Sequence, residues 1–166
     1  GFVQGEFALR MRDGQRAVMA FRRTTQAHPD QPIGWLKLSE ALRLNGDFEA
    51  ALEALNRAEE KGAEPWQVAH GRAQTARANG QPDVALTRYH QADWSHAPEM
   101  YFDEWYELAS AREDELAQRR AAASFTTAHP NNAQAWGRLG GVLRRQGYLE
   151  PAIEPLQRAA ELPDGS

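Results

Sequence analysis

Three arginines close to the C-terminus, Arg138, Arg144 and Arg145, have the side chains best suited to bind a charged partner. A guanidinium group pairs with a carboxylate through two parallel hydrogen bonds, so we expect this cluster to recognise an acidic segment. The competing interpretation is a solvated helix end, where the helix dipole favours arginine in the last turn. Either way, the chemistry indicated is binding.

The histidines and carboxylates do not form a pattern that indicates catalysis. His90 and His96 lie six residues apart, which is a poor spacing for two metal ligands on one helix face. The acidic run Glu113-Asp114-Glu115 falls where we expect a helix to begin, and carboxylates are favourable there. The sequence has no cysteine, no glycine-rich phosphate loop and no nucleophile elbow. We therefore predict no enzymatic activity, no cofactor and no metal site.

The overall composition limits the class of partner. The formal net charge is −4 and the charges are interspersed, so we expect no nucleic-acid partner. No apolar run approaches the roughly 20 residues that cross a bilayer, so we expect no direct membrane insertion. The abundance of arginine and alanine is typical of a GC-rich bacterial gene. The sequence is compatible with either the bacterial cytoplasm or the periplasm.

One pattern of bulky and small residues recurs five times along the chain. Asn45-Gly46 recurs as Asn79-Gly80, and Trp35 and Trp136 begin similar stretches. In each repeat a first anchor is followed, always at the same distance along the chain, by a small residue. The interval between anchors is constant over the first three units, longer before the fourth and shorter before the fifth. The predicted units are approximately 1–31, which is truncated, 32–65, 66–100, 101–131 and 132–164. The anchor and small residue of each unit are Gly1 and Ala17, Trp35 and Ala51, Ala69 and Ala85, Trp105 and Ala121, and Trp136 and Ala152.

Glycine and proline mark the ends of the predicted helices. The glycines after Asp13, Asn45, Asn79 and Gln146 are expected at helix ends, where positive φ is required. Pro151 can occupy the first turn of the last helix, whereas Pro155 should kink that helix or move its start later.

The spacing resembles the tetratricopeptide repeat, whose pattern places Trp, Leu, Gly and Tyr on one helix and Ala, Phe, Ala and a closing Pro on the next. The resemblance covers nearly the whole chain, although Ala69 stands where tryptophan is expected and Arg72 where leucine is. It implies an all-α, right-handed solenoid of stacked antiparallel helix hairpins, formed by one array over 1–166. It also implies a non-enzymatic scaffold that binds another protein or a peptide segment in its concave groove. Neither end carries a polar cap, which suggests a fragment of a longer bacterial array.

In this family the first helix of each hairpin lines the groove. A subset of the family clamps the C-terminal carboxylate of heat-shock chaperones with Lys and Asn, but Leu36, Glu40 and Gly71 stand at such positions here, so we predict no such clamp. Trp35, Trp105 and Trp136 are expected in the core, whereas Trp66 and Trp94 are off the pattern and are weak candidates for partner contact. The predicted groove residues are Leu36, Lys37, Glu40, Arg43, His70, Gln74, Arg77, Tyr106, Glu107, Ser110, Arg138, Arg144 and Arg145.

Two other functions fit the same pattern. The repeats are compatible with an accessory module of a larger glycosyltransferase, sulfotransferase or hydroxylase. They are also compatible with a periplasmic scaffold in exopolysaccharide export or envelope assembly. Uncapped ends expose apolar surface, so we further expect weak self-association through them.

Overall fold

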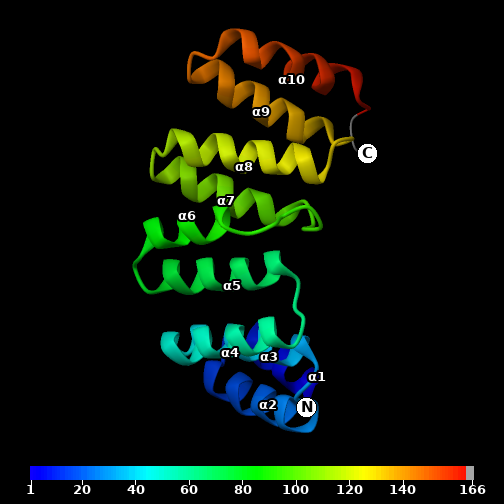
Figure 1. Cartoon of the computed structure of the whole chain (residues 1–166). Helices are drawn as coiled ribbons and strands as arrows, with labels where there is room; N and C mark the ends of the chain where they lie inside the picture. The colour runs from blue at the N-terminus through cyan, green and yellow to red at the C-terminus, as the bar shows by residue number, and fades with distance from the viewer. Residues whose placement is uncertain (164–166) are drawn as a thin grey trace. The chain divides into compact units, whose positions relative to one another are not determined.

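A computed structural model describes residues 1–163, and within that range the chain is helical without any strand (Figure 1). The predicted all-α fold of helix hairpins is confirmed. The helices are α1 (Phe2–Arg10), α2 (Gly14–Ala27), α3 (Pro32–Leu44), α4 (Phe48–Glu60), α5 (Pro65–Ala78), α6 (Pro82–His90), α7 (Met100–Ala111), α8 (Glu115–Ala128), α9 (Ala133–Arg145) and α10 (Leu149–Glu161).

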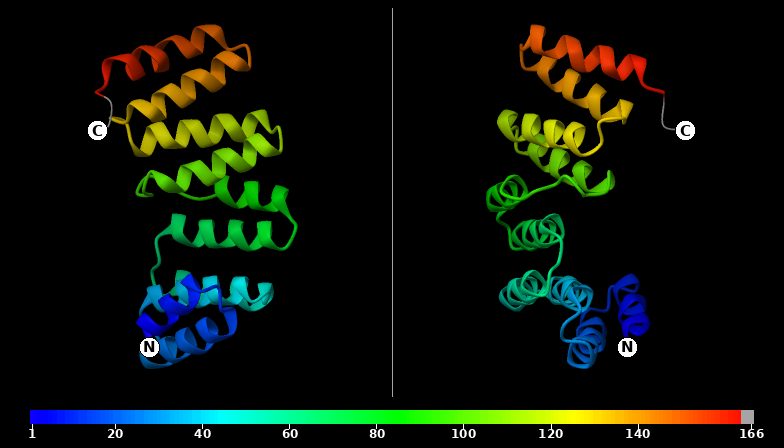
Figure 2. Two further views of the ribbon diagram at one scale, coloured as in Figure 1. Left: turned by 180° about the vertical axis from the view of Figure 1, so that it is seen from behind. Right: turned by 45° about the vertical axis from the view of Figure 1, so that its right-hand side comes forward.

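The helices belong to two compact units, Gly1–Ala92 and the part of the chain from Asp93 onward. In the first unit each helix from α1 to α6 packs against the next, and α3 also contacts α5. In the second unit α7 packs on α8, α8 on α9, and α9 on α10 (Figure 2). Each unit is therefore a stack of helix hairpins, three in the first and two in the second. A single continuous array with the five predicted boundaries stays a prediction.

Small residues let the two helices of a hairpin approach closely. Ala17 and Ala51 are fully buried in the core of the first unit. At Gly5 of α1 an added Cβ would lie 2.6 Å from the ring of Phe21 on α2. At Gly140 of α9 it would lie 2.6 Å from the side chain of Leu156. Interiors are close-packed, so these glycines leave the space that a bulky side chain of the second helix fills.

Two tryptophans make the same hydrogen bond in different units. The indole Nε1 of Trp35 donates to the carbonyl oxygen of Pro29 at 2.8 Å, and that of Trp136 donates to Pro130 at 2.7 Å. Each proline carbonyl lies just after the preceding hairpin, so each bond ties a first helix to the turn before it. The expected structural role of both residues fits this geometry, although each is only half-buried.

One residue with positive φ lies between the two helices of every hairpin, and we call it the turn residue. Gly46, Gly80 and Gly147 take this role as predicted, with φ of 83°, 74° and 85°. The expectation for Gly14 was wrong. It is the first residue of α2, because Asp13 caps that helix by accepting a hydrogen bond from the Arg16 amide at 3.1 Å. The turn residues of the first and fourth hairpins are Arg12, with φ of 55°, and Glu113, with φ of 53°.

The turn residues correct the predicted register of the fourth hairpin. They recur at an almost constant interval, as Arg12, Gly46, Gly80, Glu113 and Gly147. Counted from its turn residue, Phe102 is therefore the equivalent of Trp35 and Trp136. Trp105 is the equivalent of Leu38, and the two are 2% and 6% exposed. The predicted long interval before the fourth unit and short interval after it were wrong, because they aligned tryptophan with tryptophan.

Trp94 is a second correction, since it was expected as a candidate for surface contact. It is only 4% exposed, and its ring centroid lies 5.9 Å from that of Phe102 and 5.5 Å from that of Trp105. Phe102 in turn stacks on Phe125 at 5.0 Å. Trp94 thus completes the aromatic core of the second unit, whereas Trp66 is half-buried.

The prolines of α10 lie within the helix. It begins at Leu149, so Pro151 occupies the first turn, where no intrahelical amide hydrogen bond is lost. Pro155 lies in the interior and is buried. The helix does not begin later to avoid Pro155.

Candidate functional site

The first helices of the first unit carry an ionic cluster centred on Lys37 of α3. Its Nζ lies 2.9 Å from Oε1 of Glu6 on α1 and 3.4 Å from Oε2 of Glu40 on α3. Burial alone would lower the pKa of Lys37, but its hydrogen bond to Glu6 and the charges of Glu40 and Glu6 outweigh burial and raise this pKa. Lys37 therefore keeps its proton and links two successive first helices.

The other predicted residues of this unit lie on α3 and α5. Arg77 is exposed, whereas Leu36, Arg43, His70 and Gln74 are half-buried. Arg43 and Arg77 each precede their turn residues, Gly46 and Gly80, by three positions. The helices α3 and α5 contact each other, so these two arginines lie at equivalent positions on neighbouring first helices.

In the second unit, Arg138 of α9 is already engaged. Its Nη2 lies 2.6 Å from Oδ1 of Asp103 on α7, and only 16% of its side chain is exposed. The guanidinium carbon lies 4.8 Å from the centroid of the Tyr106 ring and 5.3 Å from that of Phe125. An ion pair and two aromatic faces therefore hold Arg138 in place.

Arg145 lies next to this group with its charge accessible. Its Nη2 donates to the hydroxyl oxygen of Tyr106 at 2.8 Å, and both Arg144 and Arg145 are exposed. An added Cβ at Gly141 would lie 3.3 Å from Nη1 of Arg145, so the missing side chain leaves room for the guanidinium. Of the remaining predicted residues, Glu107 is exposed and Ser110 is half-buried.

Asp103 belongs to the candidate site and was missed by the sequence reasoning. Counted from the turn residues, Lys37 and Arg138 are equivalent, since each precedes its turn glycine by nine positions. Both bridge back to the first helix of the hairpin before. The pairs His28-Pro29 and His129-Pro130 stand at the same distance after their turn residues, so they could have given the corrected register of the fourth hairpin from the sequence. In that register Asp103 lies on the first helix of this hairpin, α7.

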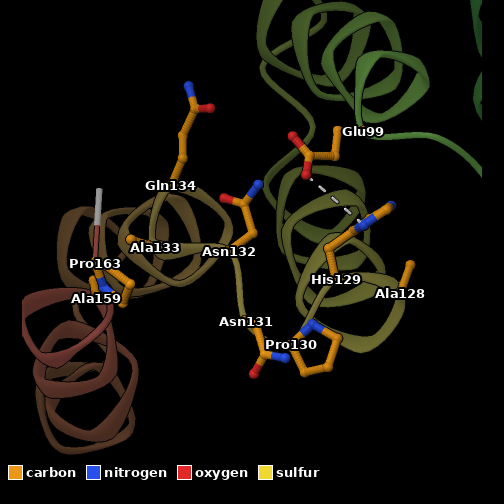
Figure 3. A pocket seen from close by; sticks show the side chains of 10 residues that line it. All are labelled: Glu99, Ala128, His129, Pro130, Asn131, Asn132, Ala133, Gln134, Ala159 and Pro163. Atoms are coloured by element: carbon orange, nitrogen blue, oxygen red, sulfur yellow. Dashed lines mark ion pairs between the residues drawn. The ribbon is translucent and has the colours of Figure 1, made fainter. Parts of the chain in front are cut away.

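A separate hollow of about 710 Å³ lies beside the loop that joins α8 and α9 (Figure 3). His129 borders it; its Nε2 donates to the carbonyl oxygen of Ala97 at 2.7 Å, and its Nδ1 lies 3.9 Å from Oε1 of Glu99. Within residues 1–163 no group of three His, Cys, Asp or Glu side chains has metal-binding geometry, and no helix there is long and apolar enough to cross a membrane.

Comparison with known proteins gives a family and a fold. The tetratricopeptide repeat family model matches residues 2–65 and 115–166. The chain is similar to the crystal structure of MamA, with a TM-score of 0.55 and 15% identity over 95% of this chain and 92% of that chain. It is also similar to the structure of Naa15/Naa10 bound to HypK-THB, with a TM-score of 0.70 and 16% identity over 96% of this chain and 24% of that chain. A third similar structure is the APC/C hetero-tetramer Cut9-Hcn1, with a TM-score of 0.55 and 13% identity over 93% of this chain and 31% of that chain. No curated protein sequence matches the chain.

Proposed function

This chain belongs to the tetratricopeptide repeat family, and we propose that it is a non-enzymatic scaffold that binds an extended acidic segment of another protein. The observation that carries the proposal is an arginine at the same repeat position of first helices, two of them on neighbouring helices of the first unit and one in the second unit. Arg43, Arg77 and Arg144 each precede a turn glycine by three positions, and the last two are exposed.

The spacing of Arg43 and Arg77 supports a particular form of partner. Neighbouring packed helices lie about 8–10 Å apart, and α3 contacts α5. A polyproline II segment rises about 3.1 Å per residue and completes one turn in about three residues, which gives about 9 Å per turn. Carboxylates at every third residue of such a segment would therefore meet successive arginines.

The second unit supports the same charge preference. Arg138 is neutralised by Asp103, so the charges left for a partner belong to Arg144 and Arg145. The hydrogen bond from Arg145 to Tyr106 orients its guanidinium before a ligand arrives. Preorganisation of this kind reduces the entropic cost of binding.

The remaining predicted groove residues give the first unit its mixed character. Lys37 is paired with Glu6 and Glu40, so its charge holds α1 and α3 together rather than attracting the acidic segment. Leu36 adds a half-buried apolar side chain on the same helix, α3. His70 and Gln74 lie on α5, where their polar groups suit the backbone of an extended peptide.

A direct test measures binding of a fluorescent peptide of Glu-Pro-Pro repeats by anisotropy. We expect Arg43→Glu with Arg77→Glu to weaken binding at least about tenfold, since each charge-assisted contact contributes about 1–2 kcal/mol. A peptide of Lys-Pro-Pro repeats should not bind. Arg22→Glu with Arg88→Glu is the matched control, because both are exposed on second helices and the change in charge is the same.

The control decides the interpretation. If the control pair weakens binding as much as the first-helix pair, the attraction depends on net charge alone and the proposed face is wrong. Failure of the acidic peptide to bind better than the basic one would reject the proposal as well.

A further inference from the structure

Tyr106 of α7 occupies a position at which the repeat otherwise has a small residue. It precedes its turn residue, Glu113, by seven positions, and it is half-buried. The second helix compensates, because the position that holds a large side chain in the other hairpins holds Ala122 here, which is fully buried. The small residues of the other hairpins are Gly5, Ser39, Ala73 and Gly140, and their large partners are Phe21, Leu55, Tyr89 and Leu156. A phenol at this one position is therefore a local departure from the repeat.

The phenol organises two arginines of the next first helix, α9. The guanidinium carbon of Arg138 lies over the ring of Tyr106, 4.8 Å from its centroid. On the same helix, Nη2 of Arg145 donates to the Tyr106 hydroxyl oxygen at 2.8 Å. A phenol orients both guanidinium groups without the negative charge of a carboxylate, so neither cation is neutralised by this contact.

Gly141 lies between these two arginines on α9, and it is a second departure from the repeat. It follows Arg138 by three positions and precedes Arg145 by four, so the three residues share one face of the helix. An added Cβ at Gly141 would lie 3.3 Å from Nη1 of Arg145. The equivalent residues of the other hairpins have long polar side chains: Glu6, Glu40, Gln74 and Glu107. The space that such a side chain takes in the other hairpins is therefore left free beside Arg145.

The first unit shows what a carboxylate does at this position. Lys37, the equivalent of Arg138, lies 3.4 Å from Oε2 of Glu40, three positions further along the same helix. Arg138 keeps a bond to Asp103 on α7, but its own helix has Gly141 in place of the second carboxylate. Its Nη1 is buried and has no hydrogen-bond acceptor among the residues that the structure describes. The α9 face therefore lacks one carboxylate that the α3 face has.

This repeat position stays open even where another first helix follows. On α3, which contacts the following first helix α5, the side chain of Glu40 is 43% exposed. On α7, where Asp103 bonds to Arg138 of the following first helix, Glu107 is exposed. An open site at Gly141 is therefore a property of the repeat position, whether or not a further first helix follows α9.

We propose that an acidic side chain of the bound segment supplies the missing carboxylate, lying beside Gly141 and accepting hydrogen bonds from Arg145. The inference rests on the proposed function and makes Gly141 the residue that selects the ligand in the second unit. Tyr106 positions the guanidinium, and the nearby charge of Arg138 adds to the attraction. The carboxylate comes from a side chain and not from a chain terminus, because an extended segment that crosses successive first helices presents its side chains to each of them.

The test measures anisotropy of the Glu-Pro-Pro peptide, blocked at both ends, with variants at Gly141. Gly141→Glu places a carboxylate within reach of Arg138 and Arg145, so it should pair internally and weaken binding at least about tenfold. Gly141→Ala adds only a Cβ and should change binding less than about threefold. Ala123→Glu is the matched control, because it makes the same change in charge at an exposed position of α8 and should leave binding unchanged.

A second variant separates loss of the contact from loss of the fold. Arg145→Gln removes the cation and should weaken binding as much as Gly141→Glu does. In the double variant the two losses should not add, because both remove the same contact. Gly141→Glu should not lower the melting temperature, since glutamate favours a helix more than glycine does.

The outcomes distinguish this inference from the proposed function. If Gly141→Glu binds as tightly as Ala123→Glu, or if its loss adds fully to that of Arg145→Gln, the inference is wrong. The proposed function still stands in that case, provided that Arg43→Glu with Arg77→Glu weakens binding. A wild type that binds no acidic peptide overturns both.

A further peptide tests the source of the carboxylate. Gln-Pro-Pro repeats with a free C-terminal carboxylate should bind no better than the same peptide with an amidated end. If the free carboxylate improves binding and Gly141→Glu removes the improvement, the site takes a chain terminus, and the inference of a side chain is overturned.

Discussion

Lys37 reaches back from α3 to Glu6 on α1, with Nζ 2.9 Å from Oε1. In the second unit the equivalent residue, Arg138 on α9, reaches back to Asp103 on α7, with Nη2 2.6 Å from Oδ1. The same repeat position thus supplies a cation that links two successive first helices in both units. Each link therefore fixes two neighbouring first helices against each other within its own unit.

We predict a measurable coupling between Lys37 and Glu6. Both side chains are about a third exposed or less, so a double-mutant cycle with Lys37→Met and Glu6→Gln should give about 0.5–1 kcal/mol. Urea denaturation followed by circular dichroism measures the four free energies of unfolding. A coupling near zero would show that solvent screens the pair.

The same pair predicts a dependence on pH. The pKa of Lys37 is raised in the folded protein: burial opposes the shift, but Glu6 and Glu40 outweigh it. The stabilisation is therefore complete below the unfolded pKa of about 10.4 and is lost as pH rises through the higher folded pKa. The difference between the urea midpoints of wild type and Lys37→Met should shrink as pH rises through the raised folded pKa of Lys37, and a constant difference would contradict the prediction.

Arg12 and Glu113 occupy turn positions that glycine fills elsewhere, and we predict that glycine stabilises both. A residue with a Cβ pays about 1–2 kcal/mol for the left-handed conformation, and glycine loses about 0.5–1 kcal/mol through extra backbone entropy. Arg12→Gly should therefore raise the free energy of unfolding by about 0.5–1 kcal/mol. Arg12→Ala is the control for charge, because alanine keeps the strain and should give no gain in thermal or urea denaturation.

We also predict that Gly5 and Phe21 are coupled by size. Gly5 lies where Ser39 lies in the second hairpin, and Phe21 where Leu55 lies. Gly5→Ser alone pushes its Cβ into the Phe21 ring and should cost about 1–3 kcal/mol. Adding Phe21→Leu recreates the combination of the second hairpin. The double variant should therefore lose less free energy of unfolding than the two single variants lose together. Strict additivity in calorimetry would show that the two sites relax independently.

The helix hairpins could be predicted from the sequence because glycines recur at the turns between helices and small residues recur where the two helices of a hairpin pack closely. Gly46, Gly80 and Gly147 were predicted correctly, since turns of this kind require positive φ. The register of the fourth hairpin was not, because Phe102 replaces tryptophan there while Trp105 fills a leucine position. The position of a tryptophan is a weaker guide to the repeat register than the position of the turn residue. In the fourth hairpin the turn residue is Glu113, so a search for turn glycines does not find it.

The candidate site was recoverable in part, for a physical reason. The cluster of Lys37 and Glu40 lies within one helix, where residues three apart are neighbours, so a sequence pattern can show it. The partner of Arg138 is far away in the sequence and lies on another helix. Asp103 therefore emerges only when the helices are stacked in the right register.

Trp94 gives the sharpest test of the corrected core. It is 4% exposed and lies against Phe102 and Trp105, so Trp94→Ala should lower the free energy of unfolding by about 3–5 kcal/mol. Trp66→Ala removes the same side chain from a half-buried site and should cost less than half as much. Trp94→Phe keeps an aromatic ring in the cluster and should recover most of the loss. Urea denaturation followed by circular dichroism measures all three. A loss for Trp94→Ala no larger than that for Trp66→Ala would contradict the prediction that Trp94 contributes more to the core than Trp66 does.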